Sequence, residues 1–114
     1  MSALRPQRWL FVCTANINRS PMALAWAERV LSSRFVTAEL DSAGSHGWDG
    51  SEAGAFTVDA MRTLDFDLRD HRSKPMSPQL LRWADYVVVM EERHADVALE
   101  LDPDCGPKLR RLWH

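Results

Sequence analysis

The segment LFVCTANINRSPMA, residues 10–23, joins an apolar run to a polar loop and then to a helical pattern. The apolar residues before the loop are continuous rather than alternating, which is typical of a strand buried on both faces of a parallel sheet. Ser20 and Pro21 indicate a helix start, with Ser20 as the cap and Pro21 at the first helical position. The cysteine, Cys13, therefore lies where a central strand ends and a loop begins.

Strand and helix patterns alternate along the rest of the chain. Besides a first strand at 9–12, strands are predicted at 38–42, 86–90 and 109–113, and helices at 21–33, 53–64, 79–84 and 91–101. The helix over 53–64 would present Phe56, Met61 and Leu64 on one apolar face. This order predicts right-handed βαβ units and an open parallel α/β sheet with helices on both faces. With 114 residues, we expect one domain over 1–114.

The composition excludes several functional classes. The formal net charge is -2 with acids and bases interspersed, so neither nucleic acid nor a membrane surface is an expected partner. No segment approaches the roughly 18 apolar residues of a membrane span and no export signal opens the chain, so we expect a cytoplasmic protein. Cys13 and Cys105 are too few for a disulfide scaffold, and the four histidines lack ligand-like spacing. We therefore expect neither a metal nor a cofactor.

Residues 13–20 have the features of a phosphate-binding loop. A tight turn from a strand into a helix points backbone N–H groups inward, and the helix start adds its positive dipole end. Arg19 can grip two phosphate oxygens at once, and such a pocket favours the thiolate of Cys13. Asn16 tolerates the left-handed backbone that a curled loop needs, and Ser20 can donate its hydroxyl toward the sulfur. The sequence therefore predicts a nucleophile at the base of a phosphate site.

Residues 12–23 closely resemble the phosphate loop of the low-molecular-weight protein tyrosine phosphatases. Further matching segments follow in the family's order: Asp41-Ser42-Ala43-Gly44 with Trp48, Asp70-His71-Arg72-Ser73, and Ala84-Asp85-Tyr86-Val87-Val88-Val89-Met90. The resemblance spans nearly the whole chain. It implies a three-layer fold, with a four-stranded parallel sheet in the order 2-1-3-4 flanked by helices.

The resemblance also implies roles for individual residues. Cys13 would attack phosphorus, Arg19 would bind the phosphoryl oxygens, and Ser20 would stabilise the thiolate. The substrate would contact the loop and an aromatic wall, a set comprising Thr14, Ala15, Asn16, Ile17, Asn18 and Trp48. The loop would be held in shape by Asn16, Ser42 and His71. A packing role for Trp48 and a solvated position for His71 remain open alternatives.

The implied activity is hydrolysis of phosphotyrosine proteins or small aryl phosphates through a phosphocysteine intermediate, with inorganic phosphate as product and inhibitor. No metal or cofactor is required. The related arsenate reductases need additional redox cysteines after the third strand, and the residues around Met90 supply none. We therefore expect a phosphatase rather than a reductase.

The sequence departs from the family pattern at two places. The loop position at which the family commonly has a second cysteine holds Asn18. The family also continues past the last strand into an Asp-Pro-aromatic motif, whose aspartate protonates the leaving phenolate, and a final helix, whereas this chain stops at His114. Asp102-Pro103 precedes the last predicted strand, so we interpret it as a turn.

The second departure leads to two expectations. A positioned general acid contributes about 10²- to 10⁴-fold, so turnover should be slow without one. The alternative to a phosphatase is therefore a catalytically impaired phosphate- or phosphotyrosine-binding module. A sheet face that the family's final helix would cover should also be open, and it could support self-association.

Overall fold

Four parallel strands form one sheet in the order β2-β1-β3-β4, as the family resemblance implies. The structure is a computed structural model that describes residues 5–112. Its elements are β1 (Gln7–Cys13), α1 (Arg19–Ser33), β2 (Ala38–Gly44), α2 (Ala55–Arg62), α3 (Pro78–Trp83), β3 (Tyr86–Val89), α4 (Glu92–Leu101), the 3₁₀ helix η2 (Pro103–Lys108) and β4 (Leu109–Arg111).

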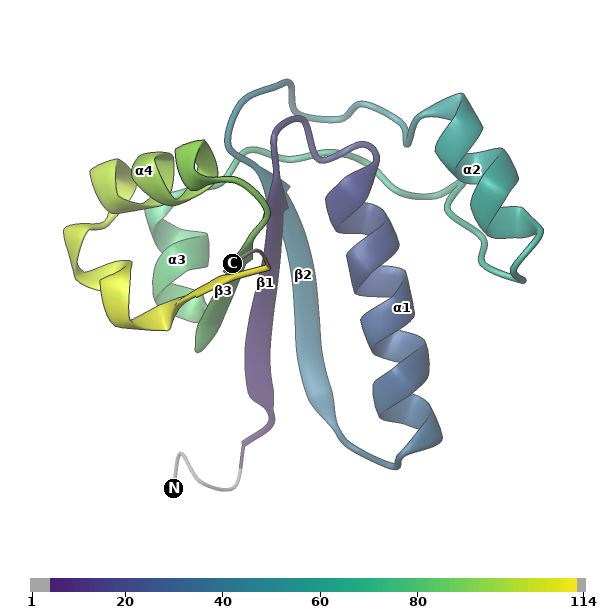
Figure 1. The fold of residues 1–114 in the computed structure, drawn as a ribbon, viewed down its shortest axis with the longest axis horizontal. Coiled ribbons are helices and arrows are strands. Elements are labelled where there is room, and N and C mark those ends of the chain that lie inside the picture. The colour runs from purple at the N-terminus through teal and green to yellow at the C-terminus, as the bar shows by residue number, and fades with distance from the viewer. Residues whose placement is uncertain (1–4, 113–114) are drawn as a thin grey trace.

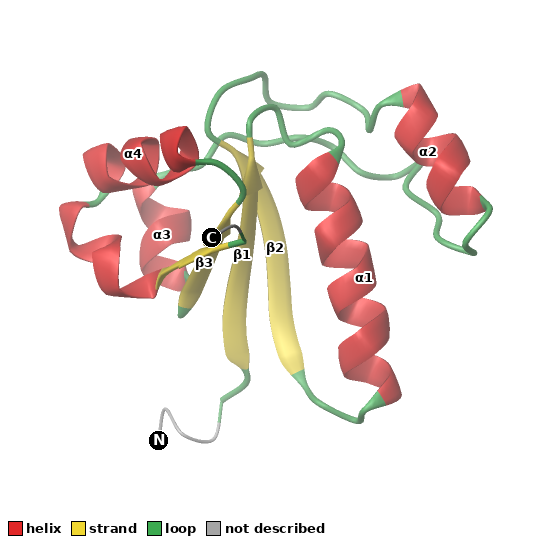
Figure 2. Ribbon diagram, in the orientation of Figure 1, coloured by secondary structure: helices red, strands yellow, loops and turns green. Residues whose placement is uncertain are grey.

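The helices lie on both faces of the sheet. Helices α1 and α2 lie on one side, and α3 and α4 lie on the other (Figure 1), so the chain forms three layers of helix, sheet and helix (Figure 2). Within residues 5–112, no helix follows β4. No helix in that described range is long and apolar enough to cross a membrane.

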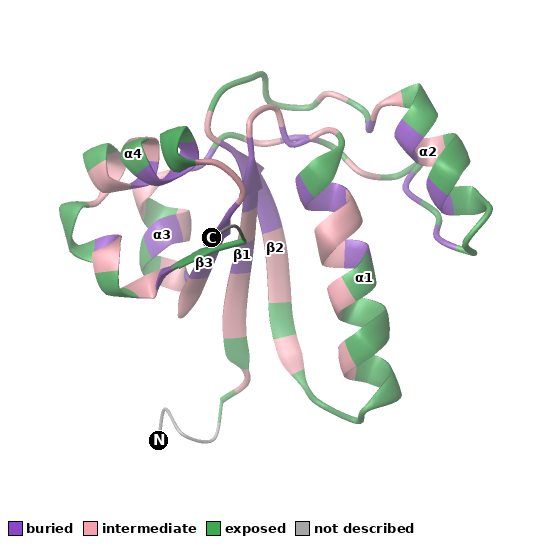
Figure 3. Cartoon of the chain, in the orientation of Figure 1, coloured by how far each residue is buried: buried purple, intermediate pink, exposed green. Residues whose placement is uncertain are grey.

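The main core lies between the sheet and the α3/α4 layer. Alternate residues of the two central strands point to this side, and Leu10 pairs in register with Val87. These residues pack against Leu81 of α3 and Ala95 of α4, all of them without exposed surface. Figure 3 shows the buried residues concentrated on the strands and on the helix faces that meet them. A smaller cluster joins α1 to α2 and the segment after it, and comprises Ala25, Ala53, Met61, Phe66 and Leu68.

Several element boundaries differ from the sequence prediction. Helix α1 begins at Arg19, with Asn18 at the N-cap, so Ser20 and Pro21 lie inside the first turn and Ser20 does not cap it. The physical reason is that the Ser20 hydroxyl contacts Cys13, which leaves it unavailable as a cap. The last strand ends at Arg111. Of the rest of its predicted range, Leu112 lies beyond the strand and Trp113 lies outside the described residues.

The predicted apolar face of the second helix is wrong in part. Helix α2 covers only Ala55–Arg62. Met61 is buried, but Phe56 is 92% exposed and Leu64 lies beyond the helix, 46% exposed. A helix of eight residues has room for little more than one buried stripe, and Thr57 and Met61 fill it.

On the α1 side of the sheet, two aromatic side chains lie next to each other, one on β1 and one on β3. The rings of Trp9 and Tyr86 lie 4.4 Å apart, and the Arg110 guanidinium lies 4.9 Å from the centre of the Tyr86 ring. Both rings are only half-buried, and Leu112 is 63% exposed. Self-association through this face stays a prediction.

We expect truncation of Leu81 to destabilise the fold. Leu81→Ala should lower the free energy of unfolding by about 2–5 kcal/mol, because it leaves a cavity between the short helix α3 and the sheet. Phe56→Ala is the control and should change this free energy by less than about 0.5 kcal/mol, because the side chain is exposed. Urea denaturation measures both values, and equal effects of the two substitutions would contradict the core described above.

Candidate active site

Cys13 is the last residue of β1, at the carboxyl edge of the sheet. Its strand has β2 on one side and β3 on the other, so the strand order reverses there. Ligands of open α/β sheets bind at such a point, beyond the carboxyl ends of the strands. The position of Cys13 in the fold therefore agrees with the sequence prediction of a site at this residue.

The loop after Cys13 turns its carbonyl groups outward. Five of them accept hydrogen bonds from the surrounding protein: Cys13 from Ser45 N, Thr14 from His46 N, Asn16 from His71 Nε2, Ile17 from Gly54 N and Asn18 from Met22 N. A trans peptide points its N–H opposite to its carbonyl, so the N–H groups of the following residues face the inside of the loop. Such a ring of inward N–H groups binds an anion.

The sulfur of Cys13 lies at the base of this ring. Cys13 is 3% exposed, and its Sγ accepts a hydrogen bond from the Asn16 backbone N–H at 3.3 Å. The Ser20 hydroxyl lies 3.0 Å from the same sulfur. Since Ser20 Oγ accepts a hydrogen bond from Asn16 Nδ2, its own hydrogen is left to point at Cys13. Two donors are thus arranged around a sulfur that would carry negative charge as a thiolate.

Asn16 holds the loop together from its centre. It has a φ of 59° and no exposed surface. Its side-chain amide donates to Ser20 Oγ at 2.8 Å and to Ser42 Oγ at 2.9 Å, and its side-chain oxygen accepts from Lys74 N at 3.0 Å. One side chain thereby joins α1, β2 and the loop before α3. The structure thus brings Asn16 and Ser42 into contact, and their role in holding the shape of the loop stays a prediction.

Two further segments hold the outside of the loop. His71 Nε2 lies 2.6 Å from the Asn16 carbonyl, so His71 contacts the loop directly. Asn18 accepts a hydrogen bond from the Thr57 hydroxyl of α2 at 2.6 Å. A Cβ at Gly54 would lie only 2.3 Å from Asn18 Oδ1, so any larger residue there would displace the Asn18 side chain. Asn18, which stands where the family commonly has a second cysteine, therefore ties the loop to α2.

The remaining predicted contacts lie along the rim. Gly47 has a φ of 127°, and a Cβ there would lie 3.0 Å from the Ala15 Cα, so the chain just before Trp48 runs against the loop. Trp48 itself is 81% exposed, which excludes a core-packing role. Ile17 is half-buried in the loop. The segment that carries Trp48 is held by Ser73, whose hydroxyl donates to the Trp48 carbonyl and accepts from Ser51 N.

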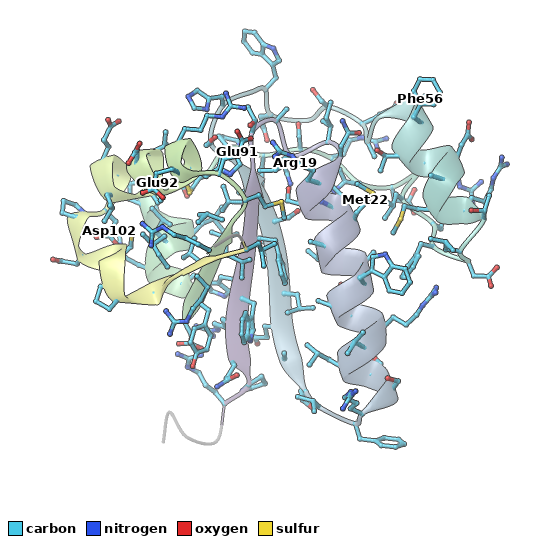
Figure 4. The ribbon with its side chains drawn as sticks, viewed as in Figure 1. Arg19, Met22, Phe56, Glu91, Glu92 and Asp102 are labelled. Carbon is cyan, nitrogen blue, oxygen red and sulfur yellow. The ribbon has the colours of Figure 1, made fainter. Side chains whose placement is uncertain are left out.

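Arg19 meets a carboxylate that the sequence interpretation did not include. Its Nη2 lies 2.8 Å from Oε2 of Glu91, the N-cap residue of α4, and 3.2 Å from the Thr14 hydroxyl. Arg93 contacts the same two oxygens, at 3.3 Å on Glu91 and 2.8 Å on Thr14. Figure 4 shows Glu91 and Arg19 close together at the upper end of the sheet. The hydrogen bonds from Arg19 and Arg93 lower the pKa of Glu91, so this carboxylate is ionised at neutral pH.

His94 completes this side of the site. It has no exposed surface, its Nδ1 accepts from the N–H groups of Met90 and Glu91, and its Nε2 lies 3.0 Å from the Thr14 hydroxyl. An Nδ1 that accepts hydrogen bonds assigns the proton of the neutral ring to Nε2, which therefore donates to Thr14. Burial lowers the pKa of His94. The charge of Glu91 opposes this shift, and the charges of Arg19 and Arg93 act in the same direction as burial.

The sequence pattern predicted the helix α4 but did not assign its first turn to the site, although the place of that turn in the chain was informative. Glu91 lies two residues after the end of β3, and the carboxyl ends of neighbouring parallel strands meet at one edge of the sheet. Asp102 is instead at the far end of α4 (Figure 4), where it accepts from Asp104 N and caps η2, so the segment interpreted as a turn is the start of a 3₁₀ helix. Cys105 is fully buried in the main core. Over the described range 5–112, no three His, Cys, Asp or Glu side chains are grouped closely enough to hold a metal ion.

Comparison with known proteins identifies the class to which this fold and site belong. Residues 8–114 match the family described as low molecular weight phosphotyrosine protein phosphatase, and the chain belongs to that family. Members of the family act on phosphorylated substrates.

Individual relatives differ in the residue that they dephosphorylate. A protein-arginine-phosphatase from Geobacillus stearothermophilus is 34% identical over 90% of this chain and 67% of its own length. The low molecular weight protein-tyrosine-phosphatase Etp from Escherichia coli is 30% identical over 95% of this chain and 70% of its own length. The crystal structure of a low molecular weight protein tyrosine phosphatase from T. tengcongensis superposes with a TM-score of 0.86, with 30% identity over 92% of this chain and 72% of that one.

Removal of the Asn16 side chain should collapse the loop. We expect Asn16→Ala to lower the free energy of unfolding by about 3 kcal/mol, because two buried partners and one half-buried partner lose their hydrogen bonds and alanine disfavours a positive φ. Its affinity for inorganic phosphate should fall as well. Ser42→Ala removes one of the three contacts and should cost about 1 kcal/mol. Urea denaturation and calorimetric titration measure these changes, and unchanged phosphate affinity in Asn16→Ala would contradict the role assigned to its side chain.

The buried His94 should make stability depend on pH. Its pKa in the folded protein lies below the ordinary 6.5, so below that pH the unfolded chain binds the proton more readily. The contribution of His94 to the stability of the folded protein is therefore complete at pH values above the pKa that His94 has in the unfolded chain. It is lost as the pH falls through and below that pKa. We expect the melting temperature to drop between pH 7 and pH 5, and His94→Gln to flatten this drop. If the melting temperatures of the two proteins fall by the same amount between pH 7 and pH 5, His94 is not the source of the pH dependence.

Proposed function

We propose that this protein is a cysteine-dependent phosphatase that hydrolyses phosphotyrosine or aryl phosphate monoesters through a phosphocysteine intermediate. The observation that carries the proposal is the position of Cys13 Sγ, beneath a loop whose N–H groups face inward. A phosphoryl group held by those N–H groups would have the sulfur directly on one side. Membership of the phosphatase family supports the same chemistry.

The reaction divides into two steps with named roles. In the first, the Cys13 thiolate attacks phosphorus, the bond from phosphorus to the aryl oxygen breaks, and the phenolate leaves and takes a proton from solvent water. In the second, water attacks the phosphocysteine and gives its proton to the solvent, the bond from phosphorus to sulfur breaks, and phosphate is released while the thiolate is regenerated. Arg19 would bind the equatorial oxygens in both transition states, and Ser20 would stabilise the thiolate as it leaves.

The substrate side chain is proposed to be aromatic. Ile17 and the exposed Trp48 offer apolar surfaces beside the loop, and a phenyl ring would bury area against both. A phosphoarginine would bring a polar guanidinium with several N–H donors to the same place. The relatives include a protein-arginine-phosphatase as well as tyrosine phosphatases, so the two substrates must be compared directly.

A second candidate function is a phosphate- or phosphotyrosine-binding module with little turnover. It is favoured by the state of the rim carboxylate, because Glu91 is ionised and paired and so is a poor proton donor to a leaving phenolate. The two candidates share the pocket and differ in rate. Leaving groups separate them further, because an activated phenolate departs without protonation.

The catalytic proposal is tested by hydrolysis of p-nitrophenyl phosphate. We expect phosphate release by the wild-type chain and a loss of at least about 1,000-fold in Cys13→Ser, because the hydroxyl is a far weaker nucleophile than a thiolate. Vanadate binding should report an intact pocket in both proteins. Equal rates in the two proteins, with vanadate still bound, would refute the enzyme and support the binding module.

The substrate proposal is tested with phosphotyrosine and phosphoarginine peptides of otherwise equal sequence. We expect kcat/KM to be at least about 10-fold higher for phosphotyrosine. Trp48→Ala should raise KM for that peptide by about 3- to 10-fold, the size of one lost aromatic contact, and leave inhibition by inorganic phosphate unchanged. Trp26→Ala is the matched control, since Trp26 packs on Phe66 away from the loop. A preference for phosphoarginine would refute the aromatic substrate.

A further inference from the structure

The guanidinium of Arg19 is held from outside the loop. In a phosphate loop, one arginine closes the ring, and its long side chain has about 2 kcal/mol of rotamer entropy to lose on being fixed. Here its Nη2 is bound by Glu91 Oε2 at 2.8 Å, and the side chain of Arg19 remains 44% exposed. The contact to Glu91 uses one corner of the planar fork, which has five N–H donors. Other donors of Arg19 stay available for phosphoryl oxygens.

Glu91 is itself fixed from several directions. It is the N-cap residue of α4, and its backbone N–H donates to the buried ring of His94 at 3.1 Å. Its carboxylate also receives Arg93 at 3.3 Å. A carboxylate held on a helix that packs against the sheet is a more rigid support than one on a free loop.

We propose that Glu91 is a positioning residue for Arg19, and that its carboxylate pre-sets the guanidinium for the phosphoryl transition state. This inference rests on the proposed function, because it concerns the arginine of that same site. Glu91 contacts Arg19 and Arg93, both of which reach the Thr14 hydroxyl, and it does not need to touch the substrate. Preorganised charge of this kind adds to the rate without reorganisation at the moment of reaction.

The charge of Glu91 predicts where its effect should appear. A carboxylate near the site repels a dianionic substrate, so its removal should favour ground-state binding while it weakens the orientation of Arg19. We therefore expect Glu91→Gln to lower kcat for p-nitrophenyl phosphate by about 10-fold and to leave KM equal or lower. Glu91→Asp, which keeps the charge, should restore kcat to within about 3-fold of the wild type.

A neighbouring glutamate supplies the matched control. Glu92 belongs to the same helical turn, and its carboxylate pairs with Arg111 of β4 at 2.9 Å rather than with the loop (Figure 4). Glu92→Gln changes the net charge by the same amount and should leave kcat and KM within about 2-fold of the wild type. If it lowers kcat as strongly as Glu91→Gln, the effect is one of overall charge and the proposal is overturned.

A double-mutant cycle separates positioning from a general loss of structure. If Glu91 acts through Arg19, then Glu91→Gln should change kcat by less than about 2-fold in an Arg19→Lys background. A full 10-fold loss in that background would show that Glu91 acts elsewhere. A higher kcat in the single variant Glu91→Gln would show that Glu91 competes with the phosphoryl group for Arg19, and would also overturn the proposal.

Vanadate and phosphate titrations keep this test separate from the test of the proposed function. Vanadate adopts the five-coordinate geometry of the transition state and phosphate resembles the ground state, so Glu91→Gln should weaken vanadate binding more than phosphate binding. A wild-type chain that binds vanadate without turnover would refute the phosphatase and still allow this comparison. Equal changes for the two anions, or no binding of either anion by the wild type, would overturn the role of Glu91.

Discussion

The buried amide of Asn16 is the contact on which the site depends. A loop of inward N–H groups needs one residue with a left-handed backbone, and asparagine adopts this conformation more readily than most side chains. Once the backbone is turned, the side chain reaches α1 and β2 and the chain near Lys74 with three hydrogen bonds. Because the bonds to Ser20 and Ser42 are buried and the one from Lys74 is partly buried, the loss of any one leaves a poorly solvated polar group, so the loop has a single well-defined shape.

The rim is organised by a different kind of contact. Thr14 presents its hydroxyl to His94 and to two guanidinium groups, and Glu91 neutralises part of their charge. This cluster is half-exposed apart from the buried imidazole, so its ion pairs contribute orientation more than stability. The base of the site is thus fixed by buried neutral hydrogen bonds, and its mouth by charged groups that a substrate can reach.

The sequence was most informative where the local pattern and the fold coincide. The apolar runs before Cys13 and Glu91 predicted two central strands, the order of elements predicted a parallel sheet, and the family resemblance implied its order 2-1-3-4. It was less informative for α2, where Phe56 fits a helical stripe but lies in solvent. Periodicity gives the spacing of apolar residues, but a helix that packs at the margin of the sheet, as α2 does, leaves part of its stripe uncovered.

The sequence by itself determined the strand, the curled loop and the side chains within it, because residues close in the chain are forced to be close in space. Only the tertiary structure decided what holds the loop from outside: the Ser73 support of the Trp48 segment and the first turn of α4 around Arg19. These partners are distant in sequence, and their approach follows from the parallel register of three strands whose carboxyl ends meet at one edge.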